Sequence, residues 1–280
     1  MALARKKRPT NWFVSMGRSL LKRLETPIQS YEKRIINNME NLYLVIRKGD
    51  VVLVEGRSKI SHIIQLLTQS SWSHVAFYVG DTLTESEIEG KKKALDENKD
   101  HGHQYMLIEA DIGTGVVAVP LSKYRDYNIR ICRPFGITSK DIEIVAAEIT
   151  SNLGKHYDHQ NIVDLAILLL PSFLNPFKKR TIKACLGGCT EYKVICSGMI
   201  ANAFQKVGYP IVPGLLPESD LGDKRMNNPY GSKLIMRHFS QIVPRDFDLS
   251  SNFEIVKFNI IGMGKFDYKS IWAGKGDLAQ

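Results

Sequence analysis

The order of apolar patterns along the chain constrains the fold more than any other feature of the sequence. Five apolar runs of strand length follow one another in the first half, at residues 51–54, 74–80, 106–109, 115–120 and 129–132. Helical periodicity dominates the second half, where we expect helices at 138–153, at about 160–170 and from 196 to 207. There is no internal repeat and no linker depleted in apolar residues. Strands followed by helices in an undivided chain predict an α+β fold.

Further elements are indicated by capping residues and by polarity. A helix after Gly56 has Ser58 as its expected N-cap, and Thr138 followed by Asp141 resembles a capping box for the helix at 138–153. Residues 82–104 are polar and highly charged, which predicts an exposed insertion. A last strand is expected near 253–261. The helix after Ser58 should have one apolar face, formed by Ile60, Ile63, Ile64 and Leu67.

Composition places the chain among ordinary globular proteins. Its 280 residues are 44% hydrophobic and 24% charged, and its four cysteines are too few for a disulfide scaffold. No apolar stretch follows the first ten residues, so we expect no secretory signal and a cytoplasmic protein. The most apolar segment, residues 162–177, is shorter than the roughly 20 residues that span a bilayer and is interrupted by Asp164 and Pro171.

The positive charge is concentrated at the N-terminus. The net charge is +9, and residues 1–35 hold nine basic and two acidic residues, which leaves the rest of the chain nearly neutral. An enzyme that binds nucleic acid would be expected to spread basic residues over its substrate domain, so this distribution argues against nucleic acid as a partner. It divides the chain into a basic arm at 1–46 and a domain at 47–280.

The arm also has an amphipathic pattern, which admits two interpretations. Phe13, Met16, Leu20 and Leu24 recur at helical spacing with basic residues between them. In the first interpretation the helix packs this stripe on the domain. In the second, residues 1–35 lie on an anionic membrane surface and make the protein a peripheral membrane protein.

The sequence offers a candidate nucleophile and a candidate base. Cys196 lies at the start of a predicted helix, where unpaired backbone N–H groups favour negative charge, although a buried cysteine is also an ordinary core residue. His74 opens a predicted strand, and Glu109 ends another from which it can orient the ring. Asp111 is a second candidate for the orienting role, because on an extended strand it faces the same side as Glu109.

Several segments together resemble a known family. GDVVLVEG, SWSHVAFYVG, LIEAD, GKHYD and ICSGMIANAF occur in the order and spacing of the permuted papain-fold cysteine hydrolases of the NlpC superfamily, in particular the YiiX/YebB-like branch. The resemblance extends from about Arg47 to residue 270. His74 precedes Cys196, as the circularly permuted branch requires. The resemblance implies an antiparallel sheet or small barrel packed against helices.

The resemblance also implies roles for individual residues. Cys196 is the nucleophile, His74 the base and Glu109 the orienting residue, while Tyr157, Ser73 and Ser197 are assigned to substrate binding. The expected reaction is cleavage of an amide, ester or thioester bond through a thioester acyl-enzyme, on a peptide or a lipid-linked substrate. An acyltransferase of the same fold, or a non-catalytic module that binds a membrane or acyl ligand, is the alternative.

No cofactor is expected. Cys185 and Cys189 lie close together in CLGGC, but no second Cys or His pair stands at ligand spacing, so the motif predicts a turn before Cys196 and no metal site. The glycine-rich patterns that hold phosphate groups are absent from the sequence.

Overall fold

The computed structural model describes residue 26 and residues 37–80, 105–111, 114–155, 196–215 and 234–259. Six of the described strands form one antiparallel sheet in the order β4-β3-β2-β1-β5-β8, and β6 and β7 form a separate pair. The expected α+β fold is confirmed, with an open antiparallel sheet. The strands are β1 (Val51–Val54), β2 (His74–Gly80), β3 (Met106–Asp111), β4 (Gly115–Pro120), β5 (Ile129–Pro134), β6 (Pro213–Leu215), β7 (Leu234–Met236) and β8 (Phe253–Val256).

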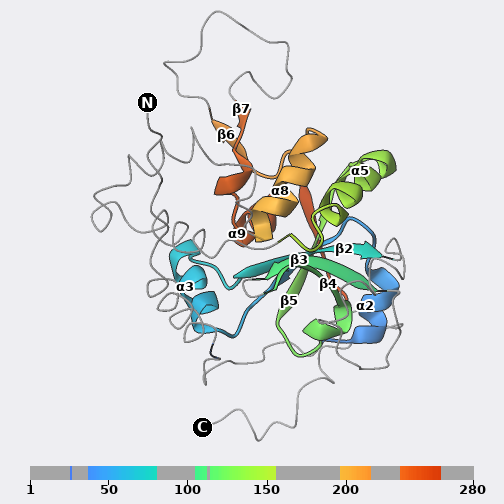
Figure 1. Ribbon diagram of the computed structural model, residues 1–280, viewed down its shortest axis with the longest axis vertical. Helices are drawn as coiled ribbons and strands as arrows, with labels where there is room; N and C mark the ends of the chain where they lie inside the picture. The colour runs from blue at the N-terminus through green and yellow to red at the C-terminus, as the bar shows by residue number, and fades with distance from the viewer. Residues whose placement is uncertain are drawn as a thin grey trace, which may run out of the picture.

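Helices cover both faces of the large sheet. Figure 1 shows α5, α8 and α9 on one side of the sheet and α2 on the other. None of the described helices is long and apolar enough to cross a membrane. The helices are α2 (Met39–Val45), α3 (Lys59–Thr68), α5 (Ser139–Thr150), α8 (Cys196–Lys206) and α9 (Pro244–Leu249), with 3-10 turns η3 (Leu121–Tyr124) and η5 (Phe239–Gln241).

The sheet is buried on both faces, which explains why its strands are continuous apolar runs. In β1, Val51 and Leu53 belong to the core cluster that includes α5 and α8. Val52 and Val54 belong to the opposite cluster, which includes α2 and η3. Residues that alternate between two apolar environments do not need to alternate in polarity.

Most of the expected elements are confirmed, with small changes at their ends. The strands at 51–54, 74–80 and 115–120 have the expected bounds, β3 and β5 each continue two residues further, and β8 stops at Val256. Ser58 and Thr138 are N-caps, and their side chains accept hydrogen bonds from the backbone N–H groups of Ser61 and Asp141. The expected helix near 160–170, the insertion at 82–104, the apolar segment at 162–177 and the arm at 1–35, apart from Thr26, lie outside the described residues.

Helix α3 forms where expected but buries less of its apolar face. Ile60 is buried, whereas Ile63 is 37% exposed and Leu66 is 71% exposed. Residues at both ends of the helix, Ile60 and Thr68, are buried, and the apolar face is partly exposed at Ile63.

The connection between β2 and β3 and the candidate residue His74 lie at opposite ends of this strand pair. Gly80 at the end of β2 pairs with Met106 at the start of β3. His74, the first residue of β2, lies at the other end of the hairpin, toward which Glu109 also lies along β3. The chain that joins the two strands therefore leaves and re-enters the hairpin at the end remote from His74.

Candidate active site

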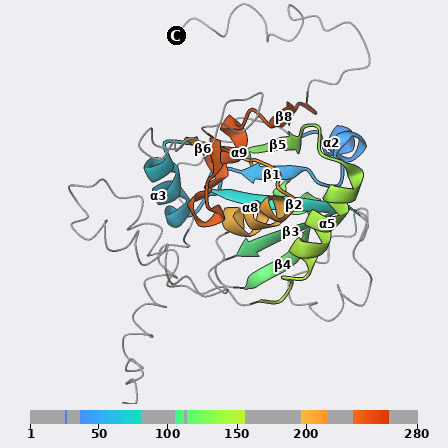
Figure 2. The ribbon, with the colours of Figure 1, turned by 90° about the horizontal axis from the view of Figure 1, so that it is seen from above.

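Three elements far apart in the sequence bring the candidate residues together. His74 begins β2, Glu109 lies on the neighbouring strand β3, and Cys196 begins α8. Helix α8 packs across β2 and β3, as Figure 2 shows. The antiparallel register pairs Glu109 with Ala76, two residues after His74, so Glu109 is a diagonal neighbour of His74 on the same face of the sheet.

His74 and Glu109 form a hydrogen-bonded pair. Nε2 of His74 lies 3.1 Å from Oε2 of Glu109, and because a carboxylate oxygen only accepts, the ring nitrogen donates to it. The Glu109 side chain is 1% exposed and the His74 side chain 20% exposed. Asp111 lies at the end of β3, where its Oδ2 accepts from the Thr114 hydroxyl at 3.3 Å. Of the two carboxylates left open by the sequence, Glu109 is therefore the one placed to orient the ring.

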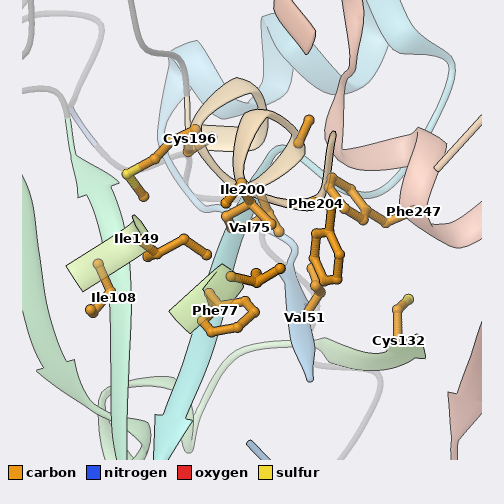
Figure 3. Close-up of a cluster of buried hydrophobic side chains, with 14 of the residues drawn as sticks. Val51, Val75, Phe77, Ile108, Cys132, Ile149, Cys196, Ile200, Phe204 and Phe247 are labelled. Carbon is orange, nitrogen blue, oxygen red and sulfur yellow. The ribbon is translucent and has the colours of Figure 1, made fainter. Parts of the chain in front are cut away.

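Cys196 occupies the first turn of α8 at one end of the buried cluster drawn in Figure 3. The residue is 8% exposed. The first N–H groups of a helix have no partner within it, so the sulfur lies where negative charge is favoured. Cys132, the other described free cysteine, lies on β5 well away from Cys196 in Figure 3. Burial raises the pKa of the Cys132 thiol to about 12, which makes it unreactive.

The pair carries opposite pKa shifts that favour its charged form. Burial by itself lowers the pKa of His74, but hydrogen bonds and charge interactions with Cys196 and Glu109 outweigh burial and raise it to about 10. Burial raises the pKa of Glu109, but the hydrogen bond and charge of His74, together with Lys123, lower it to about 2. At neutral pH the site therefore contains an imidazolium between the Cys196 sulfur and an ionised carboxylate.

Two further residues bind Glu109 and were not anticipated from the sequence. The Lys123 ammonium group donates to Oε1 of Glu109, and the Tyr124 hydroxyl donates to Oε2. Both residues lie on η3. The segment around them has no periodicity or motif, so the only available indication was that charged and aromatic residues follow directly after a buried strand.

The segment that leads into His74 is fixed by hydrogen bonds and by a cation. Nε1 of Trp72 donates to Oδ2 of Asp248 on α9 at 3.0 Å. The Arg130 guanidinium lies 5.1 Å from the centre of the Trp72 ring and also binds Asp248. These contacts, made by β5 and α9, hold the start of β2 in place.

The residues assigned to substrate binding have different environments. Ser73 is buried, and its hydroxyl accepts from the Gly56 N–H at 3.0 Å. Ser197 is fully buried and donates to the Ile242 carbonyl at 2.7 Å. Both hydroxyls thus take part in internal hydrogen bonds. Tyr157 lies outside the described residues.

No metal centre is present among the described residues, since no group of three His, Cys, Asp or Glu side chains is placed to hold an ion. Cys185 and Cys189 lie outside the described residues. The described site places a thiol at a helix start next to an imidazole that a carboxylate orients, which is suited to nucleophilic attack on an acyl carbon.

Comparison with known proteins gives a match to one family over part of the chain. Residues 45–164 match the model of a family described as permuted papain-like amidase enzymes, YaeF/YiiX, C92 family. This segment contains His74 and Glu109 and ends before Cys196. A search of curated proteins found no match. Among solved structures, the chain is similar to the metalloprotein yiiX from Escherichia coli O157:H7, with 17% identity, a TM-score of 0.44, and coverage of 76% of this chain and 97% of that one.

The family match accounts for features that the sequence and the fold each show independently. The motifs of the first half fall on β1, β2 and β3, and the histidine precedes the cysteine along the chain. The resemblance inferred from the sequence is thereby confirmed. Over residues 45–164, the chain is therefore similar to the YaeF/YiiX family of permuted papain-like amidases.

Proposed function

We propose that this chain is a thiol hydrolase that cleaves an acyl bond through a covalent thioester on Cys196. The observation that carries the proposal is that His74 is hydrogen-bonded to the buried Glu109 and interacts with Cys196 at the start of α8. A base held between a nucleophile and an orienting carboxylate is the common arrangement of thiol and serine acyl hydrolases. The match of residues 45–164 to an amidase family supports the same class of reaction.

The first half of the proposed reaction forms the acyl-enzyme. The Cys196 thiolate attacks the acyl carbon, and the carbonyl oxygen becomes an oxyanion beside the unpaired N–H groups at the start of α8. The His74 imidazolium donates its proton to the leaving amine, alcohol or thiol. The bond to that group breaks, and a thioester remains on the enzyme.

The second half releases the acid. Neutral His74 removes a proton from water, and the resulting hydroxide attacks the thioester carbon. The carbon–sulfur bond breaks, the carboxylic acid leaves, and the thiolate and imidazolium are restored. Glu109 keeps the ring oriented and stabilises its positive charge throughout, without taking the proton itself.

Within this class we place amides first, because the family is one of amidases. The basic arm at 1–35 and the apolar segment at 162–177 favour a lipid-linked acyl compound over a soluble peptide, since both would interact with a membrane surface.

The test is covalent labelling followed by turnover. The full chain is incubated with peptide and lipid-linked amides, esters and thioesters, and intact mass spectrometry detects the acyl adduct. Cys196→Ala should form no adduct. His74→Ala should acylate about 10²–10⁴ times more slowly, because it lacks the general acid. Glu109→Gln should lose part of the rate, because the ring keeps a partner but loses its countercharge.

Circular dichroism of each variant excludes unfolding as the cause. An adduct that survives in Cys196→Ala would exclude this cysteine as the nucleophile. Full acylation by His74→Ala would assign the proton transfers to another group. Because the three residues act as one unit, the loss in the double variant Glu109→Gln/His74→Ala should be smaller than the product of the single losses.

A further inference from the structure

The Glu109 carboxylate receives three donors, two more than are needed to orient a histidine. Its Oε2 accepts from His74 Nε2 and from the Tyr124 hydroxyl, and its Oε1 accepts from the Lys123 ammonium group. Glu109 and Tyr124 are buried, whereas the Lys123 side chain is 39% exposed. The carboxylate thus lies between two cations, one of which reaches it from the solvent side.

We infer that Lys123 and Tyr124 are positioning residues of the proposed hydrolase, which hold the Glu109 carboxylate in place and limit the negative charge that it offers to His74. The inference rests on the proposed function of Cys196 and His74. Tyr124 fixes the oxygen that His74 also uses. Lys123 neutralises part of the negative charge of the Glu109 carboxylate. It thereby sets the pH range over which His74 keeps its proton.

The 3-10 turn that carries both residues is rigidly attached to the rest of the fold. Nδ2 of the buried Asn37 donates to the carbonyls of Tyr124, Arg125 and Tyr127 at 3.1, 3.0 and 2.7 Å. At the start of η3, the Leu121 N–H donates to the Tyr105 carbonyl at 2.8 Å. A turn held at both ends can hold side chains to the tolerance that an active site requires.

The aromatic ring of Tyr124 adds a second constraint. It packs edge-on against Tyr127, with ring centroids 5.4 Å apart, and lies 6.4 Å from the His74 ring. The Lys123 ammonium lies 5.3 Å from the centre of the Tyr124 ring. The hydroxyl of Tyr124 remains protonated, because burial and the neighbouring Glu109 charge hold its pKa well above its usual value. It is therefore a permanent donor to the carboxylate.

The charge of Lys123 acts against that of the imidazolium. Two cations that share one carboxylate each weaken the other's attraction to it, so removal of Lys123 leaves His74 with the full countercharge. The groups that face the pair come from every element packed around it: Cys196 of α8, Asp111 of β3, Lys123 and Tyr124 of η3, and Tyr127 beyond the turn. Among them Lys123 is the cation that binds Glu109 together with His74.

The test follows the pH dependence of Cys196 alkylation by iodoacetamide from pH 7 to 11.5, a range that includes the pKa of His74 and the expected shift, and it requires no substrate. The change in alkylation rate that accompanies the titration of His74 is identified as the one that is missing from the pH profile of His74→Ala. In Lys123→Met this change should move upward by about half to one pH unit, because a nearby cation is gone. Lys123→Arg keeps the charge and should restore the wild-type profile.

Lys48→Met is the matched control, because Lys48 pairs with Glu143 at 2.5 Å and its loss also removes one cation and one ion pair. Lys48→Met should leave the pH profile of Cys196 alkylation unchanged.

Tyr124→Phe should lower kcat several-fold at unchanged KM on whichever acyl substrate is found, since only the position of the Glu109 carboxylate oxygen is disturbed. Far-ultraviolet circular dichroism monitors folding of all variants.

The outcomes separate this inference from the proposed function. If Lys123→Met and wild type have the same profile while His74→Ala differs, Lys123 has no influence on His74 and the inference fails alone. An equal shift in Lys48→Met would also overturn it, since the effect would be one of net charge. If His74→Ala alkylates as the wild type does, the pairing of Cys196 with His74, and with it the proposed function, is wrong.

Discussion

At the scale of single residues, the site depends on how far each side chain reaches. Glu109 and Asp111 lie on the same strand two positions apart, and the sequence alone treats them alike. Glu109 pairs with Ala76, two residues after His74, and its longer side chain reaches diagonally to the His74 ring, where it is fully buried. A buried carboxylate needs donors for its oxygens, and His74 and η3 supply them.

The environments of the two described cysteines predict a difference in reactivity. Cys196 lies at a helix start beside His74, whereas burial, together with the negative charge of Asp248, raises the pKa of Cys132 to about 12. We therefore expect iodoacetamide near neutral pH to modify Cys196 much faster than Cys132. Peptide mass mapping after short exposures measures both rates in one sample. Equal rates, or faster modification of Cys132, would refute the activation of Cys196.

The pKa shifts of His74 and Glu109 predict a dependence of stability on pH. The pKa of His74 is about 10 in the folded protein against an ordinary 6.5, so its stabilisation is complete below pH 6.5 and is lost as the pH rises toward 10. Glu109, with a pKa of about 2 against an ordinary 4.5, stabilises above pH 4.5 and loses this as the pH falls toward 2. The contribution of the pair should be greatest between these ranges.

Urea unfolding at pH 6, 7, 8 and 9 measures how the free energy of unfolding falls as His74 loses its proton. In the wild type, His74 should contribute a decline of up to about 1.4 kcal/mol per pH unit in this range. His74→Ala should lack that component, although it will be less stable at pH 6. Parallel curves for the two proteins would mean that the histidine does not carry its proton in the folded state.

At the scale of elements, the sequence predicted those with a strong pattern and missed those without one. The strands of the sheet are buried on both faces, so their apolar runs were evident, and Thr138 marked the start of α5. The turn η3 has four residues and α9 has six, too few for a periodic pattern. The contact of η3 with Glu109 depends on tertiary packing, so Lys123 and Tyr124 were not foreseeable from local sequence.

Helix α8 is held by its apolar face, which predicts where substitutions will be costly. Phe204 is fully buried and packs against Phe77 and Phe253, with ring centroids 6.1 and 5.5 Å away. Phe204→Ala should lower the free energy of unfolding by about 3–5 kcal/mol, because it leaves a cavity. Leu66→Ala on the exposed face of α3 should change it by less than about 0.5 kcal/mol.

Urea titration of both variants at one pH gives the comparison. A small loss for Phe204→Ala would mean that α8 is not anchored at this position. A large loss for Leu66→Ala would mean that the exposed face of α3 is covered in solution.

At the scale of the whole molecule, charge is divided between arm and domain, and this division predicts membrane binding. We propose that residues 1–35 attach the protein to anionic membranes, because they combine basic residues with an apolar helical stripe. Sedimentation with vesicles that contain phosphatidylserine should show binding that weakens as salt is added, since each basic residue contributes about 1 kcal/mol through a screened interaction.

A variant with glutamine at Arg5, Lys6, Lys7 and Arg8 is the matched control, because it keeps the length and the apolar stripe. It should bind more weakly. Deletion of residues 1–35 keeps Asn37 and α2, which pack with the domain, and should abolish binding. Binding by the deletion variant equal to that of the full chain would place the membrane contact elsewhere.

The connection between β2 and β3 lies at the end of the strand pair remote from His74, and this position determines where residues can be inserted into the chain. The residues between Gly80 and Met106 join the strands at the end remote from His74, and a seven-residue strand separates that end from the site by about 20 Å. Length can therefore be added to this connection, by evolution or by an engineer, while the register that pairs Ala76 with Glu109 stays the same. A reporter domain, or new chain termini, placed between Gly80 and Met106 would leave His74 and its carboxylate as neighbours in space.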